Sequence, residues 1–309
     1  MTRAGELALR GAGGEPVDLA RTIASHGLVD LPPFRPDGDA LEATVRLGTS
    51  GARTILIAAG RPGHADVEVR GRARPDAALE VAAHVLRLDE NLSPFYEAAA
   101  DDPDLSWATR GAGRLVRSQT VFEDVVKTIC TTNCAWSATV RMVGALVEHL
   151  GDRATGAPAD SPLGRAFPTP AAMAWAPIDF YRDTVRAGYR GPYLQSLATS
   201  VADGELDLEE LGSAPEGELP DDDVAARLLA LPGVGPYAAA HVMMLLGRYS
   251  RLILDSWTRP KYASVTGRKA KDSTIERHFR RYGRYAGLAF WLVLTRDWVE
   301  EADVPPELA

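Results

Sequence analysis

The first third of the chain alternates short apolar runs with turns, a pattern typical of strands. Residues 41–47, 54–58 and 65–70 (LEATVRL, TILIA and ADVEVR) are rich in β-prone side chains, and short glycine-containing turns separate them. Three successive runs joined in this way predict an antiparallel sheet. A helical pattern over residues 76–88 follows Pro75, which suits the first turn of a helix.

From about residue 110 onward, the apolar positions recur at helical spacing. Thr120 and Glu123 have the spacing of a capping box, and an apolar stripe follows over residues 122–130. A second stripe covers residues 142–150, and another helix is expected over residues 192–201. Most of the chain is therefore predicted to be helical.

Together the two patterns predict an α+β fold, mostly α. A small antiparallel sheet with one helix would form an N-terminal domain over residues 1–88. Residues 89–309 would form an all-helical domain. The length of 309 residues favours such a division, because the chain is long for a single core.

The composition is that of a soluble globular protein, with 46% hydrophobic and 25% charged residues. No apolar run approaches the roughly 20 residues that cross a bilayer, and the N-terminus lacks the apolar core of a signal peptide, so we expect a cytoplasmic protein. The two cysteines, Cys130 and Cys134, exclude a disulfide scaffold and a four-cysteine metal or cluster site. Their spacing predicts that both point into one packed face. No metal and no cofactor are expected.

Charge is spread unevenly along a chain whose net charge is −8. Residues 203–223 carry acidic side chains and no basic one, whereas residues 258–285 are predominantly basic. The basic segment includes Arg259 and Lys261 and could bind phosphates while the rest of the surface stays acidic. A solvated basic helix face explains the segment equally well.

Residues 223–246 (DVAARLLALPGVGPYAAAHVMMLL) predict two helices joined by a tight turn. Gly233 and Gly235 permit positive φ and close approach of another backbone, and Pro236 suits the start of the second helix. The amides around Val234, Gly235 and Tyr237 would then lie at a helix N-terminus, where they can donate to a phosphate whatever the base sequence. Gly233, Val234 and Gly235 are therefore predicted to contact DNA. An ordinary helical hairpin with a glycine turn is the alternative.

An acidic residue, Asp255, directly follows an apolar run and lies 18 residues beyond Tyr237. On its own, such an aspartate is most simply a helix cap. After the glycine hairpin, it resembles the helix–hairpin–helix–Gly/Pro–Asp superfamily of DNA glycosylases, in the 8-oxoguanine and alkylpurine branch. The resemblance implies that Asp255 is the catalytic carboxylate beside a flipped nucleotide. The Gly/Pro element is degenerate here, with Ile253 and Leu254 before the aspartate.

The resemblance extends over roughly residues 30–300 and implies two helical subdomains with a cleft between them. Residues 86–96 are similar to the segment that enters the helical core of these enzymes. Asn133 ends a helix whose polar end faces DNA in the family, which implies that it fills the gap left by the extruded base. Tyr189 and Arg190 match the wedge segment, which implies that Tyr189 intercalates and Arg190 contacts the estranged partner base. A helix stop and a surface turn are the simpler explanations for these three residues.

Two departures from the family shape the functional prediction. Bifunctional 8-oxoguanine enzymes carry a lysine where this chain has Tyr237, and without that amine no Schiff base forms, so no lyase activity is expected. The implied base pocket consists of Tyr237, His241, Trp257 and Phe290. Such an aromatic wall suits an electron-deficient, alkylated purine. Each aromatic residue could instead belong to the core, and His241 could be a buried structural histidine.

The sequence therefore predicts a monofunctional DNA glycosylase of base excision repair, which hydrolyses the N-glycosidic bond of a flipped, damaged purine. Its partner would be double-stranded DNA containing a damaged base, bound by a monomer at the nucleoid. Three alternatives stay open. They are an 8-oxoguanine-type glycosylase with altered specificity, a non-catalytic DNA-binding protein that retains the hairpin, and a glycosidase acting on free nucleosides, which the acidic net charge would fit.

Overall fold

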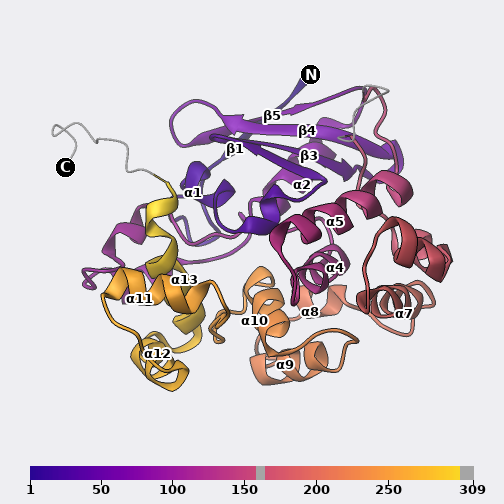
Figure 1. The fold of residues 1–309 in the computed structure, drawn as a ribbon. Helices are drawn as coiled ribbons and strands as arrows, with labels where there is room; N and C mark the ends of the chain where they lie inside the picture. The colour runs from indigo at the N-terminus through magenta and orange to yellow at the C-terminus, as the bar shows by residue number, and fades with distance from the viewer. Residues whose placement is uncertain (158–163, 300–309) are drawn as a thin grey trace.

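The computed structural model describes residues 1–157 and 164–299, in which a five-stranded antiparallel sheet is followed by a mostly helical region (Figure 1). The strands lie in the order β1–β5–β4–β3–β2. Their bounds are β1 (Thr2–Ala8), β2 (Phe34–Asp37), β3 (Ala40–Arg46), β4 (Ala52–Ala59) and β5 (His64–Val69). The predicted α+β fold, mostly α, is confirmed.

The three strands predicted from the sequence are the three central strands of this sheet, β3, β4 and β5. The sequence prediction missed the two edge strands. Strand β1 contains Gly5 and is mostly exposed, and β2 contains Pro36, which an edge strand tolerates because one side of it has no hydrogen-bonding neighbour. Edge strands therefore lack the alternating apolar pattern that marked the central ones.

Helix α2 (Pro75–Val85) packs against the sheet through Ala78, Ala82 and Val85, all of which are buried. It was predicted to continue to residue 88. It ends earlier because Arg87 has a positive φ of 54°, a conformation that a right-handed helix cannot contain.

The remaining helices are short to medium in length, and Thr120 caps one of them as predicted, because its Oγ1 accepts the Glu123 amide at 3.2 Å. They are α1 (Leu19–Ile23), α3 (Ser93–Ala99), α4 (Val121–Thr131), α5 (Trp136–Leu150), α6 (Pro170–Trp175), α7 (Arg190–Ala202), α8 (Glu209–Ser213), α9 (Asp221–Leu229), α10 (Pro236–Leu245), α11 (Thr258–Thr266), α12 (Asp272–Phe279) and α13 (Ala286–Thr295). Among the described residues, no helix is both long and apolar enough to span a bilayer.

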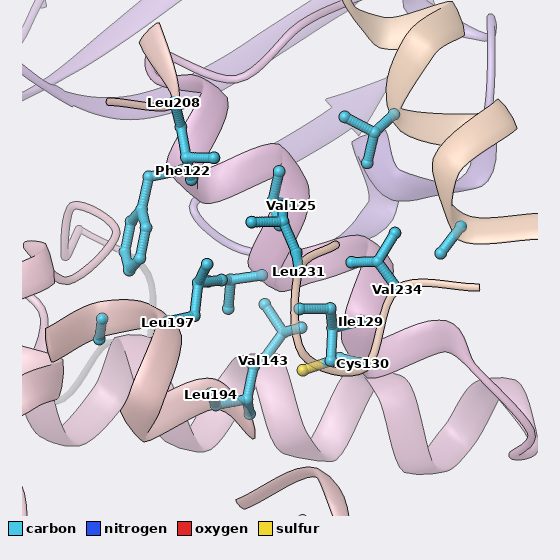
Figure 2. Packing of buried hydrophobic residues seen from close by; sticks show 14 of the residues in the cluster. Phe122, Val125, Ile129, Cys130, Val143, Leu194, Leu197, Leu208, Leu231 and Val234 are labelled. Atoms are coloured by element: carbon cyan, nitrogen blue, oxygen red, sulfur yellow. The ribbon is translucent and has the colours of Figure 1, made fainter. Parts of the chain in front are cut away.

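The turn between α9 and α10 is anchored in a hydrophobic core. Figure 2 shows Leu231 and Val234 of this turn beside Ile129 of α4, with side chains of α5 and α7 in the same cluster. Each turn side chain buries apolar surface, and a buried Leu or Val contributes about 1.5–3 kcal/mol. The turn is therefore held in one position relative to α4.

Helix α10 lies between two cores of the helical region. Val242 and Met243 pack into the core that holds α4, whereas Ala240 and Met244 pack into a second core built around α13. In Figure 1, α10 accordingly lies between α4 and α8 on one side and α11 and α13 on the other. Because α10 is buried on all sides, residues at its N-terminus are fixed relative to both cores.

Candidate active site

A cleft of about 1120 Å³ opens where the α4–α5 turn, the glycine hairpin, α10 and the segment before α11 meet. Eight residues singled out from the sequence line it: Asn133, Tyr189, Gly233, Gly235, Tyr237, His241, Asp255 and Trp257. They come from separate segments of the chain. The cleft is therefore a product of the tertiary fold.

Of the two glycines in the hairpin turn, only Gly233 has the positive φ that the sequence allows; Gly235 is extended, with a φ of −100°. Gly233 has a φ of +81°, which favours glycine, and α10 begins at Pro236. The amides in the first turn of α10 have no intrahelical acceptor and can donate to an anion. The phosphate contact of Val234 stays a prediction; in this structure its side chain is buried and its amide donates to the Leu231 carbonyl at 3.2 Å.

The Asp255 carboxylate is held at the start of α11. Its Oδ1 accepts the amides of Trp257 at 2.9 Å and Thr258 at 2.6 Å. Both bonds use the same oxygen, which leaves Oδ2 for a ligand in the cleft. Asp255 is thus both a helix cap and a cleft residue, so the two interpretations of its sequence position are compatible.

Tryptophans form much of the cleft wall. The rings of Trp257, Trp291 and Trp298 pack against one another in pairs, with ring centroids 5.6–5.7 Å apart. Trp136 lines the cleft from the start of α5 and is 45% exposed. Of these four tryptophans, only Trp257 was predicted from the sequence to line the pocket.

The predicted pocket residue Phe290 does not line the cleft. It is fully buried, 5.3 Å from the Phe279 ring and 6.1 Å from the Tyr262 ring, in the core around α13. Its neighbour Trp291 lines the cleft instead. Successive residues on a helix point about 100° apart, so an error of one position in the match places the wrong side chain in the pocket.

His241 is a neutral group at the side of the cleft. It is 9% exposed, and its ring meets those of Tyr237 and His26 edge-on, with centroids 5.9 Å and 6.3 Å away. Burial lowers the pKa of His241 to about 4, against a weaker opposing effect of the Asp255 charge. At neutral pH the ring therefore adds no positive charge to the cleft.

Tyr189 and Asn133 meet at the mouth of the cleft. Tyr189 is 52% exposed, and its hydroxyl accepts a hydrogen bond from Asn133 Nδ2 at 3.2 Å. Asn133 has a positive φ of 46°, which asparagine tolerates better than most residues and which ends the path of α4. The two residues predicted to face DNA, Tyr189 and Asn133, therefore lie next to each other on the cleft.

Arg190 does not face the cleft as its predicted contact with a base requires. Its guanidinium donates to the carbonyl and the Oγ1 of Thr132, and the side chain is 6% exposed. The Tyr189 ring covers it at 4.6 Å. In this structure Arg190 therefore ties α7 to the end of α4, which corrects the prediction.

Two basic side chains of the segment 258–285, Arg259 and Lys261, are paired with acidic residues in this structure. Arg259 makes two bonds of 2.9 Å to Asp272, and Lys261 bonds to Asp297 at 2.6 Å. Neither residue lines the cleft; Arg259 lies at a separate hollow beside α9 and α12. Their predicted role in phosphate binding requires DNA to displace these acidic partners.

The two cysteines and the candidate metal ligands are placed as follows. Cys130 is buried in the core as predicted, and Cys134, which is half-buried, packs against the same core and also lines the cleft. Over residues 1–157 and 164–299, no group of three or more His, Cys, Asp or Glu side chains is placed to hold a metal ion.

Solved structures of DNA glycosylases are similar to this one in fold. The structure is similar to a 3-methyladenine DNA-glycosylase from Archaeoglobus fulgidus, with a TM-score of 0.71, 19% identity, and coverage of 95% of this chain and 98% of that one. The chain has the helix–hairpin–helix DNA glycosylase fold. No family model matches the sequence, and no curated protein matches it either.

Two further glycosylase structures share the fold. MBOgg1 in complex with a low-affinity DNA ligand matches with a TM-score of 0.69 and 17% identity, over 91% of this chain and 93% of that one. A Clostridium acetobutylicum 8-oxoguanine glycosylase/lyase, in complex with double-stranded DNA containing cytosine opposite 8-oxoG, has a TM-score of 0.66 and 18% identity, over 88% and 92%. At sequence identities of 17–19%, the structural similarity shows the fold alone.

Within this glycosylase fold, the cleft combines one carboxylate with several aromatic rings. Asp255 is the single acidic residue among the described residues that line it, and no lysine or arginine is among them. A carboxylate can stabilise positive charge on a bound group, and aromatic faces attract cations. The cleft therefore suits a cationic ligand.

Proposed function

We propose that the protein is a monofunctional DNA glycosylase that excises alkylated, positively charged purines from duplex DNA. The observation that carries the proposal is the Asp255 carboxylate, fixed at the start of α11 in a cleft walled by tryptophans and free of lysine and arginine. The glycosylase fold supports the reaction class. The cleft chemistry supports the choice of substrate.

The charge of the cleft favours a cationic base over a neutral one. Alkylation of a purine ring nitrogen at N3 or N7 gives the base a positive charge, and a cation over an aromatic face gains about 0.5–2 kcal/mol. The Asp255 carboxylate adds a further attraction. A neutral His241 leaves these attractions unopposed.

DNA would be held by its backbone and opened by a wedge. The first-turn amides of α10 would donate to a phosphate near Gly235, which fixes the duplex without reading its sequence. Tyr189 would enter the base stack, and Asn133 beside it would occupy the space left behind. Unstacking costs a few kcal/mol and is cheapest for a weakly paired, damaged base.

Asp255 would act on the sugar of the flipped nucleotide. Cleavage of the N-glycosidic bond builds positive charge on the sugar, as in glycoside hydrolysis generally. The carboxylate would stabilise that charge and orient or deprotonate the attacking water. A cationic purine leaves as a neutral base without a proton from the enzyme, so one carboxylate suffices.

The absence of a cleft amine supports monofunctional chemistry. A glycosylase/lyase forms a Schiff base between an amine and the sugar. The sequence resemblance assigns Tyr237 to the position of that amine, and the Tyr237 hydroxyl lies 3.3 Å from the Thr131 hydroxyl. The product would then be an abasic site with an intact strand.

The test is a panel of duplexes that carry 3-methyladenine, 7-methylguanine, hypoxanthine, ethenoadenine or 8-oxoguanine. We expect release of 3-methyladenine and 7-methylguanine, with strand breaks only after alkali. Asp255→Asn is the matched control, because it keeps the size and much of the capping geometry while removing the charge. It should bind the same duplexes and lose at least about a thousandfold in excision rate. Full excision by this variant would refute the catalytic role of Asp255.

An 8-oxoguanine glycosylase is the second candidate, because MBOgg1 and the Clostridium acetobutylicum enzyme match nearly as well as the 3-methyladenine enzyme. The panel separates the two. Preferential release of 8-oxoguanine would favour this second candidate, and release of the charged bases favours the proposal. Binding without release of any base would indicate a non-catalytic DNA-binding protein.

A further inference from the structure

Tyr193 lies between the glycine hairpin and the Tyr189 wedge, although it does not line the cleft. It is on the first turn of α7, one turn after Tyr189, and is 38% exposed. Nothing in the proposed chemistry uses its side chain. Its contacts nevertheless join the two elements that would meet DNA.

The first contact is with the tip of the hairpin. A Cβ atom built on Gly233 would lie 2.9 Å from Tyr193 Cδ2 and 3.4 Å from its Cβ and Cγ. The Tyr193 ring therefore packs directly against the backbone of the turn. Glycine at position 233 serves this approach as well as the positive φ of 81°.

The second contact is with the wedge. The rings of Tyr193 and Tyr189 meet edge-on, with centroids 6.2 Å apart and planes at 73°. Edge-on contact is a favourable geometry for two aromatic rings. Tyr189 in turn bonds to Asn133 at the end of α4. A continuous series of contacts thus runs from Gly233 through Tyr193 and Tyr189 to Asn133.

We propose that Tyr193 is a positioning residue, which couples the backbone grip of the hairpin to insertion of the Tyr189 wedge. The inference rests on the proposed function of the hairpin and the wedge. When the hairpin amides bind a phosphate, the Tyr193 ring fixes how far Tyr189 stands from that phosphate. Because the Tyr189 side chain is already held at the correct distance, it can enter the base stack without first losing conformational freedom.

The probe is a duplex with 2-aminopurine next to a tetrahydrofuran abasic-site analogue. Insertion of the wedge unstacks 2-aminopurine and raises its fluorescence, so stopped-flow mixing measures insertion without any excision. Binding to an undamaged duplex, followed by anisotropy, reports the backbone grip separately. Both measurements use the full chain.

Tyr193→Ala is expected to slow insertion about tenfold and to change affinity for the undamaged duplex less than about twofold. Tyr193→Phe keeps the ring that makes both contacts and should retain the wild-type insertion rate. In a Tyr189→Ala background, Tyr193→Ala should cost nothing further, because the wedge through which it acts is gone. A residue with a merely structural role would have the same effect in both backgrounds.

Wild-type insertion by Tyr193→Ala, or an undiminished effect in the Tyr189→Ala background, would overturn the coupling alone. No fluorescence change with the wild-type protein would overturn the proposed function itself, and the coupling with it. If the alanine variant fails to fold by circular dichroism, Tyr193→Leu gives the same test, because leucine fills the space without a flat aromatic edge.

Discussion

Asp255 and Thr258 bind each other reciprocally at the start of α11. The Asp255 amide donates to Thr258 Oγ1 at 2.8 Å, and the Thr258 amide donates to Asp255 Oδ1 at 2.6 Å. The pair has the logic of a capping box, in which two side chains satisfy each other's backbone amides. Because Thr258 is fully buried, its hydroxyl has no competing water. The carboxylate is therefore fixed in direction before any substrate arrives.

This pair predicts that Thr258→Val slows excision without weakening DNA binding. Valine keeps the shape but removes the hydroxyl, so the Asp255 amide loses its acceptor and the carboxylate loses its fixed direction. We expect kcat to fall about tenfold to a hundredfold, since small misplacements of a catalytic group have effects of this size. Thr258→Ser, which keeps the hydroxyl, should stay within a few-fold of wild type. Single-turnover kinetics with 7-methylguanine duplexes measure both.

A charged residue at position 241 should weaken the preference for cationic bases. His241→Arg would place a permanent positive charge at the side of the cleft, where the native ring is neutral. We expect kcat/KM for 7-methylguanine to fall at least about a hundredfold, and that for neutral hypoxanthine to fall much less. His241→Gln is the neutral control. Equal losses for both bases in the arginine variant would argue against electrostatic selection.

Tyr237→Lys should introduce covalent chemistry. The new amine would lie in the cleft with Asp255, where it can attack the sugar and form a Schiff base. Borohydride should then trap a protein–DNA adduct that wild type does not form, and strand breaks should appear without alkali. Tyr237→Met, with no amine, is the size-matched control. Trapping of the wild-type protein would contradict its monofunctional assignment.

The features that the sequence predicted well are those that depend on neighbours along the chain. The glycine hairpin follows from helical stripes on either side of Gly233 and from Pro236, and the Thr120 cap follows from a spacing of three residues. Asp255 could be found because its distance from the hairpin is set by the chain itself. Features of this kind can be recognised even when the overall sequence identity to known structures is low.

The errors concern side-chain direction and long-range pairing. Phe290 and Trp291 are adjacent on an apolar helix, and only packing decides which of them faces the cleft. Arg190 turns inward because the Thr132 carbonyl lies within its reach, which the sequence does not reveal. The partner of Arg259 is 13 residues away on another helix, so its ion pair could not be anticipated from local charge.

Two buried histidines, His26 and His241, and the half-buried His84 predict that the protein loses stability as pH falls below neutral. Burial lowers the pKa of His26 to about 3 and the pKa values of His84 and His241 to about 4. In the unfolded chain these rings take up protons near pH 6.5, whereas in the folded protein they stay neutral until pH 4 or below. The unfolded state therefore binds more protons in this window, and the free energy of unfolding falls as pH drops through it.

Asp124 has the opposite effect on the pH dependence of stability, so its substitution serves as the control. Burial raises the pKa of Asp124 to about 7, so between pH 4 and 6.5 the folded state holds a proton that the unfolded state has lost. The three histidines and Asp124 together give a net difference of about two protons between the unfolded and folded states. The free energy of unfolding therefore falls by at most roughly 2–3 kcal/mol for each pH unit, at about 1.4 kcal/mol for each proton.

Urea denaturation at several pH values measures this slope. His84→Gln should make it shallower by one proton and Asp124→Asn should make it steeper by one, because each removes a group of opposite sign. A slope that neither substitution changes would mean that other groups control acid unfolding.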